Sequence, residues 1–223
     1  KINVTVPTGN FGNILAAYYA KEMGIPINKL ICASNKNNVL YDFMDKGVYD
    51  KNREFFTTIS PSMDILISSN LERLLHLLSE KDSSKVKELM NELQTKGIYE
   101  IDDNMKNALK DFYGNFASEE DTKDAIEQVH KQYDYLIDTH TAVAYSVNEK
   151  YKEEFNDSTK AIIASTASPY KFPYSVMNSI DSKYSDFDDF KLVKEMSELI
   201  KEEEPTAIKD IQKREVLHNT VCE

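Results

Sequence analysis

The sequence is poor in residues that mark several classes of protein. Only two of its 223 residues are cysteines, and it has no tryptophan. Cys32 and Cys222 lie far apart and have no cysteine neighbours, so the sequence indicates neither a disulfide framework nor a zinc site. No apolar run reaches the length of a membrane span. The four histidines also lack the spacing of metal ligands, which leaves no indication of a metal centre.

Positive charge is also in deficit. There are 27 lysines and arginines against 38 acidic residues, a formal net charge of −11. This balance argues against nucleic acid or an anionic membrane as the partner, because both require a basic surface. A local cup for a small anion remains compatible with it. Since the sequence has few cysteines and no signal peptide, we expect a cytoplasmic protein.

A glycine-containing loop near the start is the most informative stretch. Pro7-Thr8-Gly9-Asn10-Phe11-Gly12-Asn13 follows the β-branched run 2–6 and precedes an apparent helix over 14–23. Gly9 and Gly12 are expected to take positive φ or to let a ligand approach, and Asn13 is expected to be the helix N-cap. Such a loop directs free N–H groups and the helix dipole at one point, which suits a phosphate. An ordinary strand-to-helix turn is the alternative interpretation.

The next segments predict an α/β protein. A second strand over 30–33 completes a strand–helix–strand unit and therefore a parallel sheet with helices on both faces. A short helix is expected over 39–45. Ser62 is expected to cap a longer helix that begins in the segment 60–64 and carries an apolar stripe as far as Leu78. The polar stretch 81–133 predicts an all-helical insertion, with an approximate capping box at 118–121.

The last third returns to the sheet. Asp138 or Thr139 is expected to cap a helix, in which His140 is either structural or a proton carrier near a ligand. The run 160–164 predicts a buried strand that ends at Ser165 and Thr166, on the ligand-binding edge of the sheet. A final helix is expected over 188–201, with its apolar stripe packed on the body of the protein.

Four segments resemble threonine synthase, and they occur in that family's order. They are the loop 8–13, the sixteen residues 60–75, the Ala-Val-Ala-Tyr segment that follows Asp138, and the segment 165–172. The resemblance implies a tryptophan synthase β-like fold, that of fold type II pyridoxal 5′-phosphate enzymes. It also implies that the parent enzyme converts O-phospho-L-homoserine and water to L-threonine and phosphate.

The resemblance also implies roles for particular residues. The cofactor-binding positions are Gly9, Asn10, Phe11, Gly12 and Asn13 for the phosphate, and Thr166 for the pyridine nitrogen. Candidate substrate ligands are Asn70, Arg73 and Lys171, and pairing with neighbouring side chains is the alternative for each. Two positions depart from the family pattern: Asn13 replaces a frequent aspartate, and Ser168 replaces a histidine. Any role of that histidine is therefore in doubt.

The resemblance covers only the C-terminal half or so of a threonine synthase. No catalytic residue is expected in this chain, because the lysine that forms a Schiff base with the cofactor is expected upstream of Lys1 with the small N-terminal domain. A sequence that enters a core strand at once suggests a piece of a longer protein, and a processed N-terminus is the alternative. The expected division is 1–75 and 134–223 in the cofactor-binding domain and 76–133 as the insertion.

The sequence leaves the function and the assembly partly open. One alternative is another fold type II enzyme, such as a serine or threonine dehydratase, and another is a non-catalytic phosphate-binding α/β module. The expected partners are the small-molecule substrate and the missing N-terminal half. The sequence does not determine the oligomeric state.

Overall fold

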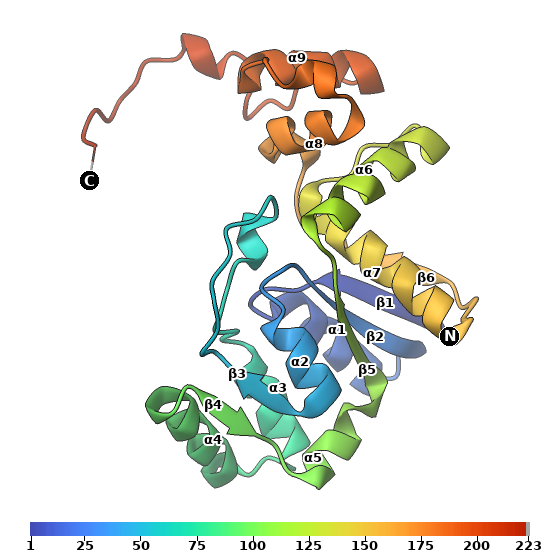
Figure 1. Ribbon diagram of the computed structural model, residues 1–223, viewed down its shortest axis with the longest axis vertical. Helices are drawn as coiled ribbons and strands as arrows, with labels where there is room; N and C mark the ends of the chain where they lie inside the picture. The colour runs from blue at the N-terminus through green and yellow to red at the C-terminus, as the bar shows by residue number, and fades with distance from the viewer. Residues whose placement is uncertain (222–223) are drawn as a thin grey trace.

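Four parallel strands form the sheet on which the site is built, in a computed structural model that describes residues 1–221 (Figure 1). The strand order is β5-β2-β1-β6, and every neighbouring pair is parallel. The strands are β1 (Ile2–Pro7), β2 (Ile27–Ser34), β5 (Phe112–Phe116) and β6 (Ala161–Ile163). Parallel strands need crossover connections, and the helices between them supply these.

Helices cover both faces of this sheet, as the sequence predicted. Leu30 and Cys32 of β2 pack into a core shared with α1 (Gly12–Glu22) and α2 (Val39–Lys46). The alternate residues of β2, Ile31 and Ala33, pack with side chains of α7 (Thr139–Phe155). Successive residues of a strand point to opposite faces, so β2 is buried on both sides over residues 30–33, which are all apolar.

The remaining elements surround the sheet. Helices α6 (Glu119–Tyr133), α8 (Pro173–Ile180) and α9 (Asp189–Ile200) share a further apolar cluster. Figure 1 shows α8 and α9 at the top, with α6 below them. The other elements are β3 (Val48–Asp50), α3 (Leu71–Leu78), α4 (Ser83–Thr95), β4 (Ile98–Glu100) and α5 (Asp103–Ala108). No helix within residues 1–221 is long and apolar enough to cross a membrane. Cys222 lies outside the described residues.

The predicted helix that begins in the segment 60–64 is wrong. That segment forms only a 3₁₀ turn over Pro61–Met63, and the chain then runs irregularly to α3, which begins at Leu71. The Asp64 carboxylate, which follows this turn, accepts hydrogen bonds from the side chains of Asn35, Asn37 and Thr58. These tertiary hydrogen bonds compete with helix formation and prevail over the apolar periodicity.

Two other expectations need correction. The stretch 81–133 is not all helical, because it contains β4 and also β5, which pairs with β2 in the main sheet. Whether 76–133 forms a separate unit stays a prediction. The strand predicted over 160–164 forms as β6, but it is not buried: Ile162 is 56% exposed. Within residues 1–221, β6 pairs only with β1, so it is an edge strand.

Candidate functional site

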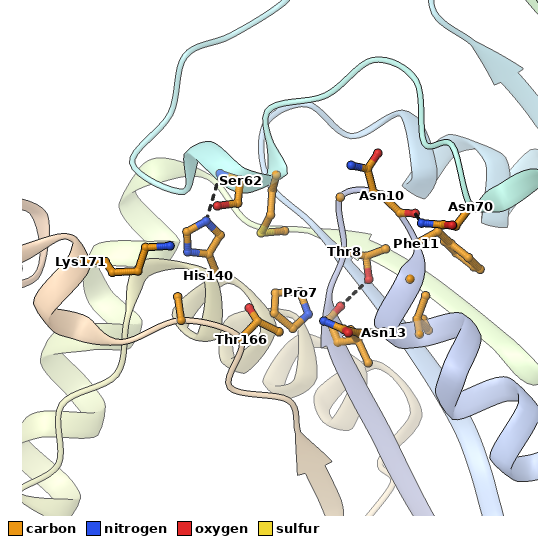
Figure 2. Close-up of a pocket in the computed structure, with 16 residues that line it drawn as sticks. Pro7, Thr8, Asn10, Phe11, Asn13, Ser62, Asn70, His140, Thr166 and Lys171 are labelled. Atoms are coloured by element: carbon orange, nitrogen blue, oxygen red, sulfur yellow. Dashed lines mark hydrogen bonds between the residues drawn. The ribbon is translucent and has the colours of Figure 1, made fainter. Parts of the chain in front are cut away.

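The glycine loop lies where β1 ends, at the carboxyl edge of the sheet, and it forms one wall of a cavity of about 270 Å³ (Figure 2). The 3₁₀ turn of residues 61–63 and the N-terminal end of α7 form other walls, together with residues 166–171. The lining residues are Val6, Pro7, Thr8, Gly9, Asn10, Phe11, Gly12, Asn13, Ile14, Ser62, Met63, Asn70, His140, Thr166, Ala167 and Lys171. Within the described chain, no carboxylate lines the cavity and Lys171 is its only lysine or arginine. The cavity therefore suits an anion.

The backbone of the loop differs from the sequence-based expectation. Neither Gly9 nor Gly12 has positive φ; the left-handed residue is Phe11, with φ 64°. Phe11 is also the N-cap residue of α1, so the expected cap at Asn13 is wrong. Burial of the Phe11 ring, which is 1% exposed and 6.1 Å from the ring of Phe112, offsets the strain of this conformation.

Side-chain hydrogen bonds hold two carbonyl groups of the loop. Ser68 Oγ donates to the Gly9 carbonyl over 2.8 Å, and Asn70 Nδ2 donates to the Asn10 carbonyl over 2.7 Å. Within residues 1–221, no acceptor is recorded for the backbone N–H groups of residues 9–14. These six N–H groups, at the positive end of α1, have no recorded protein acceptor and are available to a phosphate-sized anion; we call them the N–H cup.

An asparagine-rich network fixes the segment that carries Ser62. The Asn35 side chain donates to Thr58 Oγ1 at 2.9 Å and to Asp64 Oδ1 at 2.8 Å, and the Asn37 side chain donates to the same carboxylate at 3.0 Å. Asn38 occupies the N-cap position of α2, but its side chain accepts a hydrogen bond from Arg53 instead of capping the helix. The asparagines after β2 therefore shape the wall of the cavity, although Asn35 and Asn37 do not line it.

The opposite wall contains a buried Asp–His pair. Asp138 is fully buried and caps α7 by accepting the His140 backbone N–H over 2.8 Å, as the sequence predicted. Its carboxylate also lies 3.0 Å from Nδ1 of His140 and accepts the Thr141 hydroxyl. His140 Nε2 in turn accepts the Ser62 backbone N–H over 3.1 Å (Figure 2).

Asp138 is expected to make stability depend on pH. Burial by itself raises the pKa of Asp138, but hydrogen bonds from His140 and Thr141 outweigh it and hold that pKa below its ordinary value. The charged form therefore stabilises the fold above the unfolded pKa of about 3.9, and this contribution is lost as the pH falls through the lower folded value. Urea unfolding from about pH 6 to pH 2.5 should show the wild-type advantage over Asp138→Asn shrinking toward acid. A constant difference would contradict this assignment.

The structure brings most of the candidate residues together. Gly9, Asn10, Phe11, Gly12, Asn13 and Thr166 all line the cavity, as do Asn70 and Lys171. Arg73 does not line it; its guanidinium donates to the Asn70 side chain over 2.8 Å and lines a separate depression beside His76. Ser168, at the position of the family's histidine, caps the turn Pro169–Lys171 by accepting the Tyr170 N–H.

Other contributors were not identified from the sequence. The Ser62 backbone N–H donates to His140, and the Ser68 hydroxyl donates to the Gly9 carbonyl. Both hydrogen bonds join distant parts of the chain. The Asp138–His140 spacing was visible, but nothing in the sequence placed the ring in contact with Ser62. The sequence did show a histidine next to a predicted N-cap, and this was the one indication that His140 could lie at the site.

Comparisons with known proteins agree with this geometry. The family model described as "Threonine synthase, C-terminal" matches residues 141–221. Over 184 residues the chain is 45% identical to human "Threonine synthase-like 1", covering 82% of this chain and 24% of the relative. It is 40% identical over 202 residues to threonine synthase of Saccharomyces cerevisiae, covering 83% of this chain and 39% of that protein.

A solved structure extends the agreement to the fold. The threonine synthase of Brucella melitensis, whose structure is described as PLP-bound, superposes with a TM-score of 0.74 at 34% identity, covering 91% of this chain and 42% of that one. The parallel sheet with the glycine loop at its carboxyl edge is therefore the fold found in fold type II pyridoxal phosphate enzymes. In sequence and in fold, the chain corresponds to the C-terminal portion of the threonine synthase family. It spans about a quarter to two-fifths of the length of these curated relatives.

Proposed function

We propose that this chain supplies the cofactor-phosphate site and part of the substrate site of an enzyme that converts O-phospho-L-homoserine and water to L-threonine and phosphate. Pyridoxal 5′-phosphate is the proposed cofactor. The observation that carries the proposal is the cup of six N–H groups without protein acceptors at the N-terminal end of α1. A cytoplasmic location is part of the same proposal.

The residues of the cavity fit the cofactor phosphate. Gly9 lies so close to the Ser62 turn that a Cβ atom there would be 2.8 Å from the Ser62 carbonyl oxygen. At Gly9 the loop therefore packs tightly against this turn. The backbone N–H groups of Gly9, Asn10, Phe11, Gly12 and Asn13 would hold the phosphate. The side chain of Asn13 adds no negative charge at this position.

Thr166 and Lys171 lie on the other side of the cavity. The bound cofactor would supply an electron sink for a substrate carbanion. The Thr166 hydroxyl is a neutral partner for the pyridine nitrogen, so it would leave that nitrogen unprotonated, in contrast to a carboxylate. The Lys171 ammonium would attract the substrate phosphate as a point charge. Neither side chain replaces the reactive amine, which we propose is supplied by the part of the enzyme that precedes this chain.

A titration of the purified chain tests the phosphate site. Pyridoxal 5′-phosphate should give a saturable induced circular dichroism in the visible region, which excess inorganic phosphate abolishes. Pyridoxine 5′-phosphate has no aldehyde and cannot condense with surface lysines, so its calorimetric affinity reports the cup alone. Competition between it and phosphate is expected. Binding that phosphate does not displace would contradict the proposal.

Lys171→Ala and an exposed control separate the two anion sites. Lys171→Ala should weaken O-phosphohomoserine binding about tenfold, because one charge-assisted contact is lost, and leave pyridoxine 5′-phosphate binding within about twofold. Lys87→Ala, on the exposed side of α4, should change neither affinity.

The wild-type chain should release no phosphate from O-phosphohomoserine, since covalent catalysis requires the missing amine. Steady phosphate release would disprove the division of labour proposed here.

A further inference from the structure

One buried side chain contacts three of the segments that form the cavity. His140 is 2% exposed and lies at the start of α7. Its Nδ1 lies 3.0 Å from Asp138 Oδ1, its Nε2 lies 3.1 Å from the Ser62 amide nitrogen, and its ring centroid lies 5.0 Å from that of Phe172. Phe172 directly follows Lys171, in the segment that also contains Thr166. Within the described chain, the only recorded hydrogen bond that joins the Ser62 turn to α7 is that of His140, whereas the Met63 side chain packs against α7 through apolar contacts alone.

The hydrogen-bond partners determine which ring nitrogen carries the proton. An ionised carboxylate only accepts hydrogen bonds, so the short contact with Asp138 requires a proton on Nδ1. A backbone N–H only donates, so Nε2 must present a lone pair to Ser62. These two requirements assign the neutral tautomer with hydrogen on Nδ1. Because the Nε2 lone pair is occupied by Ser62, the ring is not available as a proton carrier in this state.

The Ser62 turn is the surface against which the glycine loop packs. The Ser62 carbonyl oxygen would lie 2.8 Å from a Cβ atom on Gly9, and the Met63 Cα atom 3.4 Å from it. A shift of this turn by a few tenths of an ångström would therefore move the Gly9 backbone, which lines the cavity. The Ser62 N–H has no recorded acceptor within residues 1–221 other than His140.

We propose that His140 is a positioning residue. Asp138 fixes its tautomer, and its Nε2 then holds the Ser62 turn against the glycine loop, so that the N–H cup is assembled before an anion binds. The cup's role as a phosphate site rests on the proposed function above. The contact between the His140 ring and the Ser62 turn does not rest on that function, so either proposal can fail without the other.

Two variants at this position separate the nitrogen atoms from the ring. His140→Phe retains an aromatic ring against Phe172 but removes both nitrogens, whereas His140→Gln places an amide oxygen near the position of Nε2. We expect His140→Phe to bind pyridoxine 5′-phosphate about tenfold more weakly than wild type, and His140→Gln within about threefold. His76→Phe, away from the cavity at the end of α3, is the matched control and should bind like wild type.

Nuclear magnetic resonance tests the positioning role without any ligand. The ¹⁵N shifts of the His140 ring should report a proton on Nδ1 and a lone pair on Nε2. Exchange of the Ser62 and Gly9 amides should accelerate at least about tenfold in His140→Phe and return toward the wild-type rate in His140→Gln. A merely structural histidine would give equal exchange rates at these amides in variants of equal stability.

The outcomes distinguish the two proposals. A wild-type ring with its proton on Nε2, or unchanged Ser62 and Gly9 exchange in His140→Phe, overturns the positioning role even if phosphate binds. If His140→Phe does not fold, the ring shifts of the wild type and the exchange rates of His140→Gln still decide. Failure of the wild-type chain to bind pyridoxine 5′-phosphate, with the expected tautomer and exchange rates, overturns the proposed function and leaves the positioning role supported.

Discussion

Gly9→Ala is expected to weaken the binding of pyridoxine 5′-phosphate at least about 100-fold, equivalent to about 2.7 kcal/mol. The added Cβ would lie 2.8 Å from the Ser62 carbonyl oxygen and 3.4 Å from the Met63 Cα atom. Both neighbours belong to the backbone, so no side chain can rotate away to relieve the overlap. The loop or the turn would have to shift, which would disturb the arrangement of the loop N–H groups. Isothermal calorimetry measures the effect directly.

Gly12→Ala is the matched control for this prediction. The nearest atom to a Cβ at Gly12 is the Asn70 side-chain nitrogen at 3.6 Å, an ordinary contact, and Gly12 is the first residue of α1. Alanine favours a helix, so this variant should bind within about threefold of wild type and be at least as stable. Equal losses in the two variants would show that chain flexibility, and not the close approach at Gly9, sets the affinity.

Asp64→Ala is expected to lower the free energy of unfolding by about 3 kcal/mol, because removing the hub of a network leaves its buried partners unsatisfied. The carboxylate accepts from the Asn35 side chain at 2.8 Å, the Asn37 side chain at 3.0 Å, and the Thr58 hydroxyl and backbone N–H at 2.7 and 2.9 Å. Asn35 is itself 1% exposed, so water cannot readily replace the lost acceptor. Urea unfolding followed by far-ultraviolet circular dichroism measures the loss.

The control for Asp64 is an aspartate with no such role. Asp124 lies on the exposed side of α6, and Asp124→Ala should change stability by no more than about 0.5 kcal/mol. If Asp64→Ala lowers the free energy of unfolding by less than about 1 kcal/mol, Asp64 is not the hub of this hydrogen-bond network. Amide exchange at Ser62 should also accelerate in Asp64→Ala, since the same segment carries the cavity wall.

Features that depend on neighbouring residues could be predicted from the sequence. The cap at Asp138 forms, and so does the capping box at Ser118, where Asp121 is the reciprocal partner. The strand–loop–helix order around Gly9 is also present, with the cavity at the expected edge of the sheet. Each of these depends on contacts a few residues apart, which the sequence displays directly.

Features that depend on distant residues could not be predicted. The segment 60–64 has helical periodicity, yet the asparagines that follow β2 hold Asp64 in a turn. Phe11 takes the left-handed conformation expected of a glycine, because its ring is buried in the core beside Phe112. β5 is a five-residue strand in a stretch that otherwise reads as helical, and it forms through its pairing with β2.

The sequence by itself determined the fold class, the position of the glycine loop and the family to which the chain corresponds, since these depend on the order of neighbouring residues and on short sequence motifs. Only the tertiary structure decided which glycine of the loop has no room for a Cβ atom and that Asp138, His140 and Ser62 form one chain of contacts. It also separated Arg73 from the cavity. The physical reason is range: a close approach or a shared hydrogen bond is a relation between two surfaces, and residues 62 and 140 meet only after the chain between them has folded.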